Sequence, residues 1–452
     1  MTAIIRPHSF SGVVRVPASK SHTIRRLLIA ALSDGVSVIE NPLDSLDTRS
    51  CAGVCRALGA EITETSSGEL WTVRGISKSR MCSGPVYCDA GNSGTTLFLG
   101  LAAAALGSAP VEFDGDEQLR RRSAGPLLEA LAGLGVSVKS AANRGKAAAG
   151  CVPITVRGPW KGGRVSLPCP TSQYLSALLL AAPLAPPGVV TEIDVPLLNE
   201  RPYIDMTLSY LRSGGIPYEA AEDYSRFRIA GGCGWKPVSG PVPGDFSSAA
   251  FPAAAAVISG GSVTLIGLDK DDTQGDKAFF GILEKMGCRV KWWPLGAAPL
   301  WRLTVSRGAE LKGGEFDLNG TPDLLPVLAA VACFARGDTA LVNAAHARIK
   351  ETDRIAVMAE ELARLGVKTT ELPDGLVIHG SGGIKETGGR FIADGCLSAD
   401  GCLSADGRGD HRVVMALAAA ALGCAAPVAI SGAECADKSY PGFLRLLGAE
   451  EA

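Results

Sequence analysis

Residues 17–32 read PASKSHTIRRLLIAAL, a polar cluster followed by a run of apolar and small residues of helical length. A similar opening recurs through the chain, at Ser21, Gly94, Ser172, Ser247, Asp323 and His411. The first four intervals are 73, 78, 75 and 76 residues, and the last is 88. This period is longer than that of solenoid repeats, so it predicts six small α/β units.

A second signal with the same period supports this prediction. Six predicted helices end in a glycine that precedes a strand-like stretch, at Gly59, Gly135, Gly215, Gly287, Gly366 and Gly448. Glycine at the C′ position can take the left-handed conformation that closes a helix. A β-branched stretch follows each Ala-rich helix, as in VTEIDVP (190–196). Each unit therefore reads helix, strand, helix, strand.

The long last interval has a visible cause. The hexapeptide ADGCLS occurs twice in tandem from Ala393 to Ser404, and without these 12 residues the interval falls to 76. We interpret the duplication as an insertion in the loop before the sixth Ala-rich helix.

Composition excludes several classes of protein. The 452 residues suffice for two or three domains, and a net charge of −2 provides no basic field for nucleic acid. The N-terminal residues lack the pattern of a secretory or import signal, and no apolar run is long enough for a membrane span. The 13 cysteines include no C-x-x-C pair, which favours reduced thiols over a zinc site. We expect a cytoplasmic monomer.

The polar helix openings carry more than capping residues. Ordinary N-caps need only Ser, Thr, Asp or Asn, whereas these openings add Lys20, Arg25, Gln173, His411 and Arg412. Helix N-termini present free N–H groups and positive potential, so such residues indicate a shared anion site. Six ordinary capped helices remain the alternative at this point.

Eight motifs occur in a defined order: SKSHTIR (19–25), DAGNSGT (89–95), DGDEQLRRR (114–122), PTSQY (170–174), RPYIDMT (201–207), ARIKETDR (347–354), GDHR (409–412) and DKSYP (437–441). Together they resemble the enolpyruvyl transferase family, in the branch that acts on 3-phosphoshikimate. The resemblance implies an α/β fold of two domains, an inside-out α/β barrel with three βαβαββ-like repeats in each. The domain boundaries would then be 20–240 for one, and 1–19 with 241–452 for the other.

The resemblance also implies an activity. Such an enzyme transfers the enolpyruvyl group of phosphoenolpyruvate to the 5-hydroxyl of 3-phosphoshikimate by addition and elimination, in aromatic amino acid biosynthesis. Both substrates are small polyanions, and the motifs are rich in Lys and Arg, which bind phosphate and carboxylate. No metal and no organic cofactor is expected, and the substrates would lie between the two domains.

Site residues are carried over from the family by motif. For phosphoenolpyruvate the expected residues are Lys20, Gly94, Arg122, Gln173, Arg354, Arg412 and Lys438. For 3-phosphoshikimate they are Lys20, Ser21, Arg25, Thr171, Ser172, Gln173, Tyr203, Asp323 and Lys350. For catalysis, Asp323 is expected as the base toward the 5-hydroxyl and Glu351 as the proton donor to C3, because the reaction needs an acid and a base. Lys20 and His411 are expected helpers.

Three positions depart from the family pattern. Phe98 stands where Arg is usual, and we expect this to weaken only a contact on the helix surface. Ser123 stands where Pro is usual. Glu200 stands where Ser is frequent, and because an acid beside a phosphate is unfavourable, we expect its side chain to point away or the contact to be lost.

Two other functions were weighed. The sister enzyme that acts on UDP-N-acetylglucosamine typically has Lys-Asn in place of Lys20-Ser21 and a reactive Cys near Arg122, whereas residues 89–150 contain no Cys. A catalytically dead anion-binding module would have no need of Lys20, Asp323, Glu351 and Arg354. Phosphate release in the presence of both substrates distinguishes these alternatives.

Overall fold

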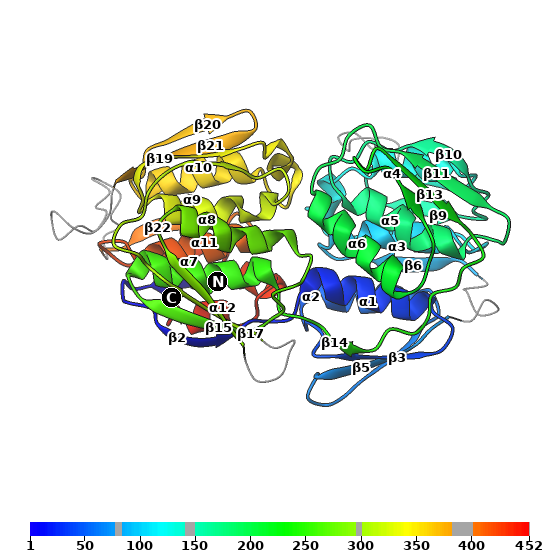
Figure 1. Ribbon diagram of the computed structural model, residues 1–452, viewed down its shortest axis with the longest axis horizontal. Coiled ribbons are helices and arrows are strands. Elements are labelled where there is room, and N and C mark those ends of the chain that lie inside the picture. Colours follow the sequence, from blue (N-terminus) through cyan, green and yellow to red (C-terminus); the bar gives the residue numbers. More distant parts are fainter. Residues whose placement is uncertain (77–83, 141–149, 295–300, 382–400, 452) are drawn as a thin grey trace. The chain divides into compact units, whose positions relative to one another are not determined.

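The computed structural model describes residues 1–76, 84–140, 150–294, 301–381 and 401–451 (Figure 1). Its contacts divide the chain into two compact units. The contiguous unit comprises Ala18–Val242, and the discontinuous unit comprises Met1–Pro17 with Pro243–Ala452. The sequence prediction put these boundaries at 19–20 and 240–241. Each unit has its own core of buried apolar side chains.

Each unit contains three four-stranded sheets. Those of the contiguous unit run, in spatial order, β14 (Gly240–Pro241), β3 (Val36–Glu40), β5 (Leu70–Arg74), β4 (Glu61–Glu64); β6 (Val86–Asp89), β7 (Val111–Asp114), β9 (Ile154–Arg157), β8 (Ser137–Ser140); and β10 (Gly163–Ser166), β11 (Val190–Asp194), β13 (Arg226–Ala230), β12 (Glu219–Ala220). In every sheet the first two strands are parallel and the remaining pairings are antiparallel.

The discontinuous unit repeats this order. Its sheets are β2 (Gly12–Arg15), β15 (Ser262–Leu268), β17 (Trp301–Ser306), β16 (Arg289–Pro294); β18 (Glu315–Asp317), β19 (Arg336–Val342), β21 (Gly375–Ser381), β20 (Thr369–Leu372); and β22 (Leu403–Asp406), β23 (Val428–Ser431), β1 (Thr2–Ile5), β24 (Glu450–Glu451). The six α/β repeats that the sequence predicted are therefore confirmed. The pattern helix, strand, helix, strand was incomplete, because each repeat also has a first parallel strand and a last antiparallel strand.

Three strands join sheets far from their place in the chain. The N-terminal strand β1 pairs with β23, and β2 pairs with β15. β14 pairs with β3 (Figure 1). β1 lies third in the sheet of the sixth repeat, between β23 and β24, while β2 and β14 each supply the first strand of a repeat. A helix and strand pattern within one 76-residue window cannot reveal such exchanges.

The Ala-rich helices form the centre of each unit. They are α1 (Lys20–Leu32), α3 (Gly94–Ala104) and α5 (Gln173–Ala181) in one unit, and α7 (Phe246–Ser259), α9 (Leu325–Ala332) and α11 (His411–Ala421) in the other. α3 contacts both α1 and α5, and α7, α9 and α11 contact one another. All residues of α11 are buried, as expected of a helix that is apolar on all sides.

The second helices of the repeats are more amphipathic. They are α2 (Leu46–Ala57), α4 (Gly125–Gly133), α6 (Arg201–Ser213), α8 (Ala278–Lys285), α10 (Arg354–Arg364) and the short α12 (Phe443–Leu446). The six periodic glycines after them all have positive φ, between 70° and 115°. This confirms the prediction that they close helices, since L-residues rarely adopt this conformation.

The tandem ADGCLS duplication lies mostly outside the described residues. Of its second copy, Leu403 and Ser404 begin β22, the first strand of the sixth repeat. The eleven cysteines that the structure describes are all free, and eight of them are buried.

Candidate functional site

In the discontinuous unit, the N-termini of several helices bring charged side chains together around Arg354. The Arg354 side chain is fully buried at the first position of α10. Its Nε donates to Asp410 at 2.8 Å, its Nη1 to Asp323 at 2.7 Å and its Nη2 to Glu351 at 2.5 Å. A second bond from Nη2 to Asp410, at 3.3 Å, engages the fourth of its five N–H donors. To bind a substrate carboxylate through two N–H groups, Arg354 must therefore exchange one of these partners.

A second guanidinium joins this network from α11. Arg412 Nη2 lies 3.0 Å from Asp323 Oδ2 and donates to Ser247 Oγ at 2.8 Å. Arg412 Nη1 lies 2.9 Å from His411 Nε2. Because a guanidinium can only donate, His411 Nε2 is the acceptor of this bond. Nε2 can take up a proton or another donor only after Arg412 has moved.

The charges of this network perturb its acids in opposite directions. Burial raises the pKa of Asp323, but the positive charges of Arg412, Lys350 and Arg354 outweigh it and hold that pKa well below its usual range. Asp276 is also buried, and burial together with the negative charge of Asp323 raises its pKa to about 7. One carboxyl is thus held ionised next to another that titrates near neutral pH, which is the electrostatic pattern of acid–base sites.

Two lysines approach the same network. Lys350 Nζ lies 3.9 Å from Asp323 Oδ1. Lys438 Nζ donates at 3.2 Å to the carbonyl of Gly409, directly before Asp410. The structure thus gathers the predicted residues Asp323, Lys350, Glu351, Arg354 and Arg412 into one network, with His411 bonded to Arg412.

In the contiguous unit, the opening of α1 contributes a lysine and an arginine. Lys20 Nζ forms an ion pair with Asp47 Oδ2 at 2.8 Å, and Asp47 lies in the first turn of α2. Arg25 is buried, and its guanidinium donates to the hydroxyls of Thr207 at 3.0 Å and Ser176 at 3.2 Å. Burial lowers the pKa of Arg25 to about 10.

The remaining acceptors of Arg25 are two carbonyls. Its Nη1 donates to Ser21 O at 3.3 Å and its Nη2 to Tyr203 O at 3.4 Å. Ser21, Arg25 and Tyr203, three residues predicted to bind 3-phosphoshikimate, are therefore in direct contact. All the acceptors of this buried cation are uncharged.

The N-terminus of α5 carries the next predicted group. The hydroxyls of Thr171 and Ser172 donate to Glu200 Oε2 at 3.0 and 2.9 Å, and the Ser172 N–H donates to the same oxygen at 3.0 Å. Glu200 is only 2% exposed. Of the two outcomes expected for Glu200, the one in which its side chain points away is wrong, because the loop before α6 directs it at these hydroxyls. The other outcome, loss of the contact with phosphate, stays a prediction.

The loop before α3 brings three further predicted residues together. A Cβ added at Gly94 would lie 3.0 Å from Arg122 Nη1, 3.4 Å from the Phe98 ring and 3.7 Å from Gln173 Oε1. That Gln173 oxygen is buried and has no hydrogen-bond partner within the described structure. A buried acceptor in this condition is suited to a ligand donor.

Phe98 differs from the sequence prediction. It is 5% exposed, so it belongs to the core and not to the helix surface. Its ring packs edge-on against Tyr174 at a centroid distance of 4.9 Å, and the Tyr174 hydroxyl donates to Ser123 O at 2.5 Å. Phe98 thereby supports the segment that carries Arg122.

Several residues of these networks were missed by the sequence analysis. They are Asp47, Ser247, Asp276 and Asp410. Two of them had a sequence signal: Asp410 caps α11 within GDHR, and Ser247 is one of the six periodic polar openings. Asp47 and Asp276 are ordinary helix-start residues until the fold brings cations to them.

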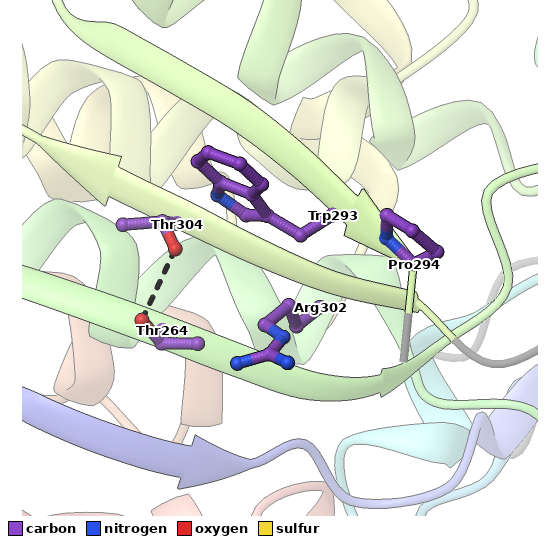
Figure 2. Close-up of a pocket in the computed structure, with 5 residues that line it drawn as sticks. All are labelled: Thr264, Trp293, Pro294, Arg302 and Thr304. Atoms are coloured by element: carbon purple, nitrogen blue, oxygen red, sulfur yellow. Dashed lines mark hydrogen bonds between the residues drawn. The ribbon is translucent and has the colours of Figure 1, made fainter. Parts of the chain in front are cut away.

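A hollow in the discontinuous unit lies apart from this network (Figure 2). It has a volume of about 340 Å³ and is lined by Thr264, Trp293, Pro294, Arg302 and Thr304, from strands β15, β16 and β17. The Thr264 and Thr304 hydroxyls lie 3.1 Å apart. None of the predicted site residues lines it.

Within the part of the chain that the structure describes, no group of three or more His, Cys, Asp or Glu side chains could hold a metal ion. None of the helices in that part combines the length and apolarity needed to cross a membrane.

This fold, with cations and carboxylates gathered at helix N-termini, is that of the enolpyruvyl transferases. EPSP synthase from Acinetobacter baumannii superposes with a TM-score of 0.79 at 25% identity, covering 99% of this chain and 97% of that one. The enolpyruvyl transferase NikO from Streptomyces tendae shares the fold with a TM-score of 0.72 at 18% identity, covering 99% and 97%.

Sequence similarity narrows this class to one family. Residues 5–447 match EPSP synthase (3-phosphoshikimate 1-carboxyvinyltransferase). A protein of that name from Acetivibrio thermocellus is 44% identical over 98% of this chain and 96% of its own length. The chain belongs to the EPSP synthase family, which confirms the branch of enolpyruvyl transferases that the motifs indicated.

Proposed function

We propose that this protein transfers the enolpyruvyl group of phosphoenolpyruvate to the 5-hydroxyl of 3-phosphoshikimate and releases phosphate. The reaction belongs to the shikimate pathway, which supplies chorismate for aromatic amino acids. The observation that carries the proposal is the network around Arg354. It joins Asp323, Glu351 and Asp410, from three segments of the chain, to one buried guanidinium.

The cations of both units suit the two substrates. We assign the phosphoenolpyruvate carboxylate to Arg354 and Arg412, because planar guanidiniums bind carboxylates bidentately. Its phosphate is assigned to Lys20, Arg122 and Lys438, with Gly94 and Gln173 beside it. The assignment of 3-phosphoshikimate is to Lys20, Ser21, Arg25, Thr171, Ser172, Gln173, Tyr203, Asp323 and Lys350.

In the addition step, the 5-hydroxyl oxygen forms a bond to C2 of phosphoenolpyruvate while C3 gains a proton. In the elimination step, C3 loses a proton and the C2–O bond to phosphate breaks. We assign Asp323 as the base that takes the hydroxyl proton and Glu351 as the group that serves C3. Lys20 and His411 assist the movement of protons.

The ion pairs of the network give this assignment a physical basis. An Asp323 carboxylate held by Arg412 and Arg354 is a weak base, because both cations stabilise its ionised form. When the substrate carboxylate takes over these guanidiniums, Asp323 and Glu351 lose positive neighbours and their proton affinity rises. Binding of substrate would thus make Glu351 and Asp323 better able to exchange protons in the complex in which the reaction occurs.

We propose that the enzyme acts as a monomer in the cytoplasm, without metal, cofactor or nucleic acid. The test is phosphate release by the purified protein. We expect release with 3-phosphoshikimate and phosphoenolpyruvate together, and none when UDP-N-acetylglucosamine replaces 3-phosphoshikimate. Release with UDP-N-acetylglucosamine, or none with either acceptor, would overturn the proposed function.

A further inference from the structure

Thr171 and Ser172, which we assign to the phosphate of 3-phosphoshikimate, already bind the carboxyl group of Glu200. Three donors converge on one oxygen, Oε2 of Glu200: the Thr171 hydroxyl at 3.0 Å, the Ser172 hydroxyl at 2.9 Å and the Ser172 N–H at 3.0 Å. The last of these donors lies at the N-terminus of α5, where the helix dipole is positive. Such a donor set suits an oxygen of a phosphate as well as one of a carboxylate.

The backbone holds Glu200 in this position. Two hydrogen bonds join its loop to the loop before α5, from Cys169 N to Leu197 O at 2.8 Å and from Asn199 N to Cys169 O at 3.1 Å. Glu200 itself has φ 59° and ψ 39°, the left-handed region that a side chain rarely adopts. Its side chain makes no capping bond to its own helix α6. The rare backbone conformation of Glu200 thus occurs together with the hydrogen bonds from Thr171 and Ser172 to its side chain.

In the unliganded protein, Glu200 also interacts electrostatically with the buried guanidinium of Arg25. The buried guanidinium of Arg25 donates only to uncharged oxygens, those of Ser21, Ser176, Tyr203 and Thr207. Burial lowers the pKa of Arg25, and electrostatic interaction with Tyr210, Tyr203 and Glu200 acts in the opposite direction. Of these three groups, Glu200 alone is a carboxylate. A buried cation is costly without an anion nearby, and Glu200 supplies one.

We propose that Glu200 is an internal competitor for the phosphate of 3-phosphoshikimate, bound to Thr171 and Ser172 until the substrate displaces it. This inference rests on the proposed assignment of these hydroxyls to that substrate. The apparent affinity for 3-phosphoshikimate then equals the intrinsic affinity multiplied by the fraction of molecules in which Glu200 has released the two hydroxyls. Glu200 would thus set the substrate concentration at which this enzyme works.

The test is calorimetric titration of 3-phosphoshikimate into the full chain without phosphoenolpyruvate. Glu200→Ser removes the competing carboxylate and should tighten binding at least tenfold. Glu200→Gln keeps the shape but not the charge, so it should bind more tightly than the wild type and less tightly than Glu200→Ser. Glu219→Ser is the matched control, because it removes an exposed carboxylate of the same unit and should leave the affinity unchanged.

Inorganic phosphate provides a second readout that a purely structural role would not move. It should compete with 3-phosphoshikimate in Glu200→Ser at concentrations that have little effect on the wild type. Equal or weaker binding of 3-phosphoshikimate by both Glu200 variants, with their thermal unfolding unchanged, would overturn the inference.

Ser172→Ala, made alone and with Glu200→Ser, separates this inference from the proposed function. Weaker binding of 3-phosphoshikimate upon loss of the hydroxyl in the Glu200→Ser background supports the site assignment. If Ser172→Ala leaves binding unchanged in both backgrounds, the assignment of the site fails and the inference fails with it. If Ser172→Ala weakens binding but Glu200→Ser does not tighten it, only the role of Glu200 is wrong.

Discussion

Replacing Asp276 by Asn should change how the stability of this protein depends on pH. Asp276 is 2% exposed, in the turn before α8. Burial, the charge of Asp323 and that of Asp245 raise its pKa, while Arg412 and a hydrogen bond from Ser247 lower it. The net effect is a rise from 3.8 to about 7.

The sign of the effect follows from linkage. Between pH 3.8 and about 7 the unfolded chain releases the Asp276 proton while the folded protein keeps it, so the free energy of unfolding falls as pH rises. At about 1.4 kcal/mol per pH unit, an interval of about three units gives a loss of ~4 kcal/mol. Below pH 3.8 this loss is absent, and above about pH 7 it is complete.

The side chain in Asp276→Asn cannot ionise, so the variant should not lose this part of its free energy of unfolding as the pH rises. Urea unfolding measures the free energy of unfolding of both proteins at pH 5 and pH 8. The difference, variant minus wild type, should increase by up to about 3 kcal/mol from pH 5 to pH 8. Asp271→Asn is the control, because Asp271 is an exposed acid in the same segment and its removal should give no such gain. If the variant and the wild type differ by the same amount at both pH values, Asp276 is not protonated in the folded protein.

Three further outcomes are expected. Glu351→Gln should lower kcat by about 10²- to 10⁴-fold with KM values nearly kept, because the amide cannot exchange a proton with C3. Gly94→Ala places a methyl group 3.0 Å from Arg122 Nη1, and steady-state kinetics should show KM for phosphoenolpyruvate raised about tenfold, or ~1.4 kcal/mol. Phe98→Ala should lower the free energy of unfolding by about 3–5 kcal/mol in urea titrations, because it leaves a cavity beside Tyr174.

Each of these changes has a matched control. Glu360→Gln alters an exposed acid on the same helix as Arg354 and should keep full turnover. A methyl group at Gly53, in α2, meets nothing within 4 Å, so Gly53→Ala should leave both KM values unchanged. Tyr87→Ala removes a ring that is 58% exposed and should cost far less stability than Phe98→Ala. Turnover by Glu351→Gln at the wild-type rate would remove that residue from proton transfer.

Local patterns in the sequence were sufficient to predict the repeating fold. Each Ala-rich helix begins within two residues of its predicted polar opening, and α3 and α11 begin at the predicted residues Gly94 and His411. The glycines that close the second helices all have positive φ, as Gly135 and Gly366 illustrate. Capping, helix termination and apolar patterning act over a few residues, so they can be read directly from the chain.

Local sequence patterns could not predict which strands pair with one another. β1 and β2 contain four residues each, and they pair with strands more than 240 residues away in the sequence. Their own sequences look like any short apolar stretch. Which sheet they complete depends on where the rest of the chain leaves an edge strand unpaired.

The candidate site divides in the same way. The family resemblance predicted Asp323, Glu351 and Arg354 as site residues, because the reaction needs an acid and a base and a guanidinium suits a carboxylate. Only the tertiary structure decided that Asp410 completes the shell of Arg354, and that Glu200 turns toward Thr171 and Ser172. Sequence determines which groups a segment can offer, whereas the meeting of an acid with a cation or a hydroxyl from another segment depends on packing across the whole unit.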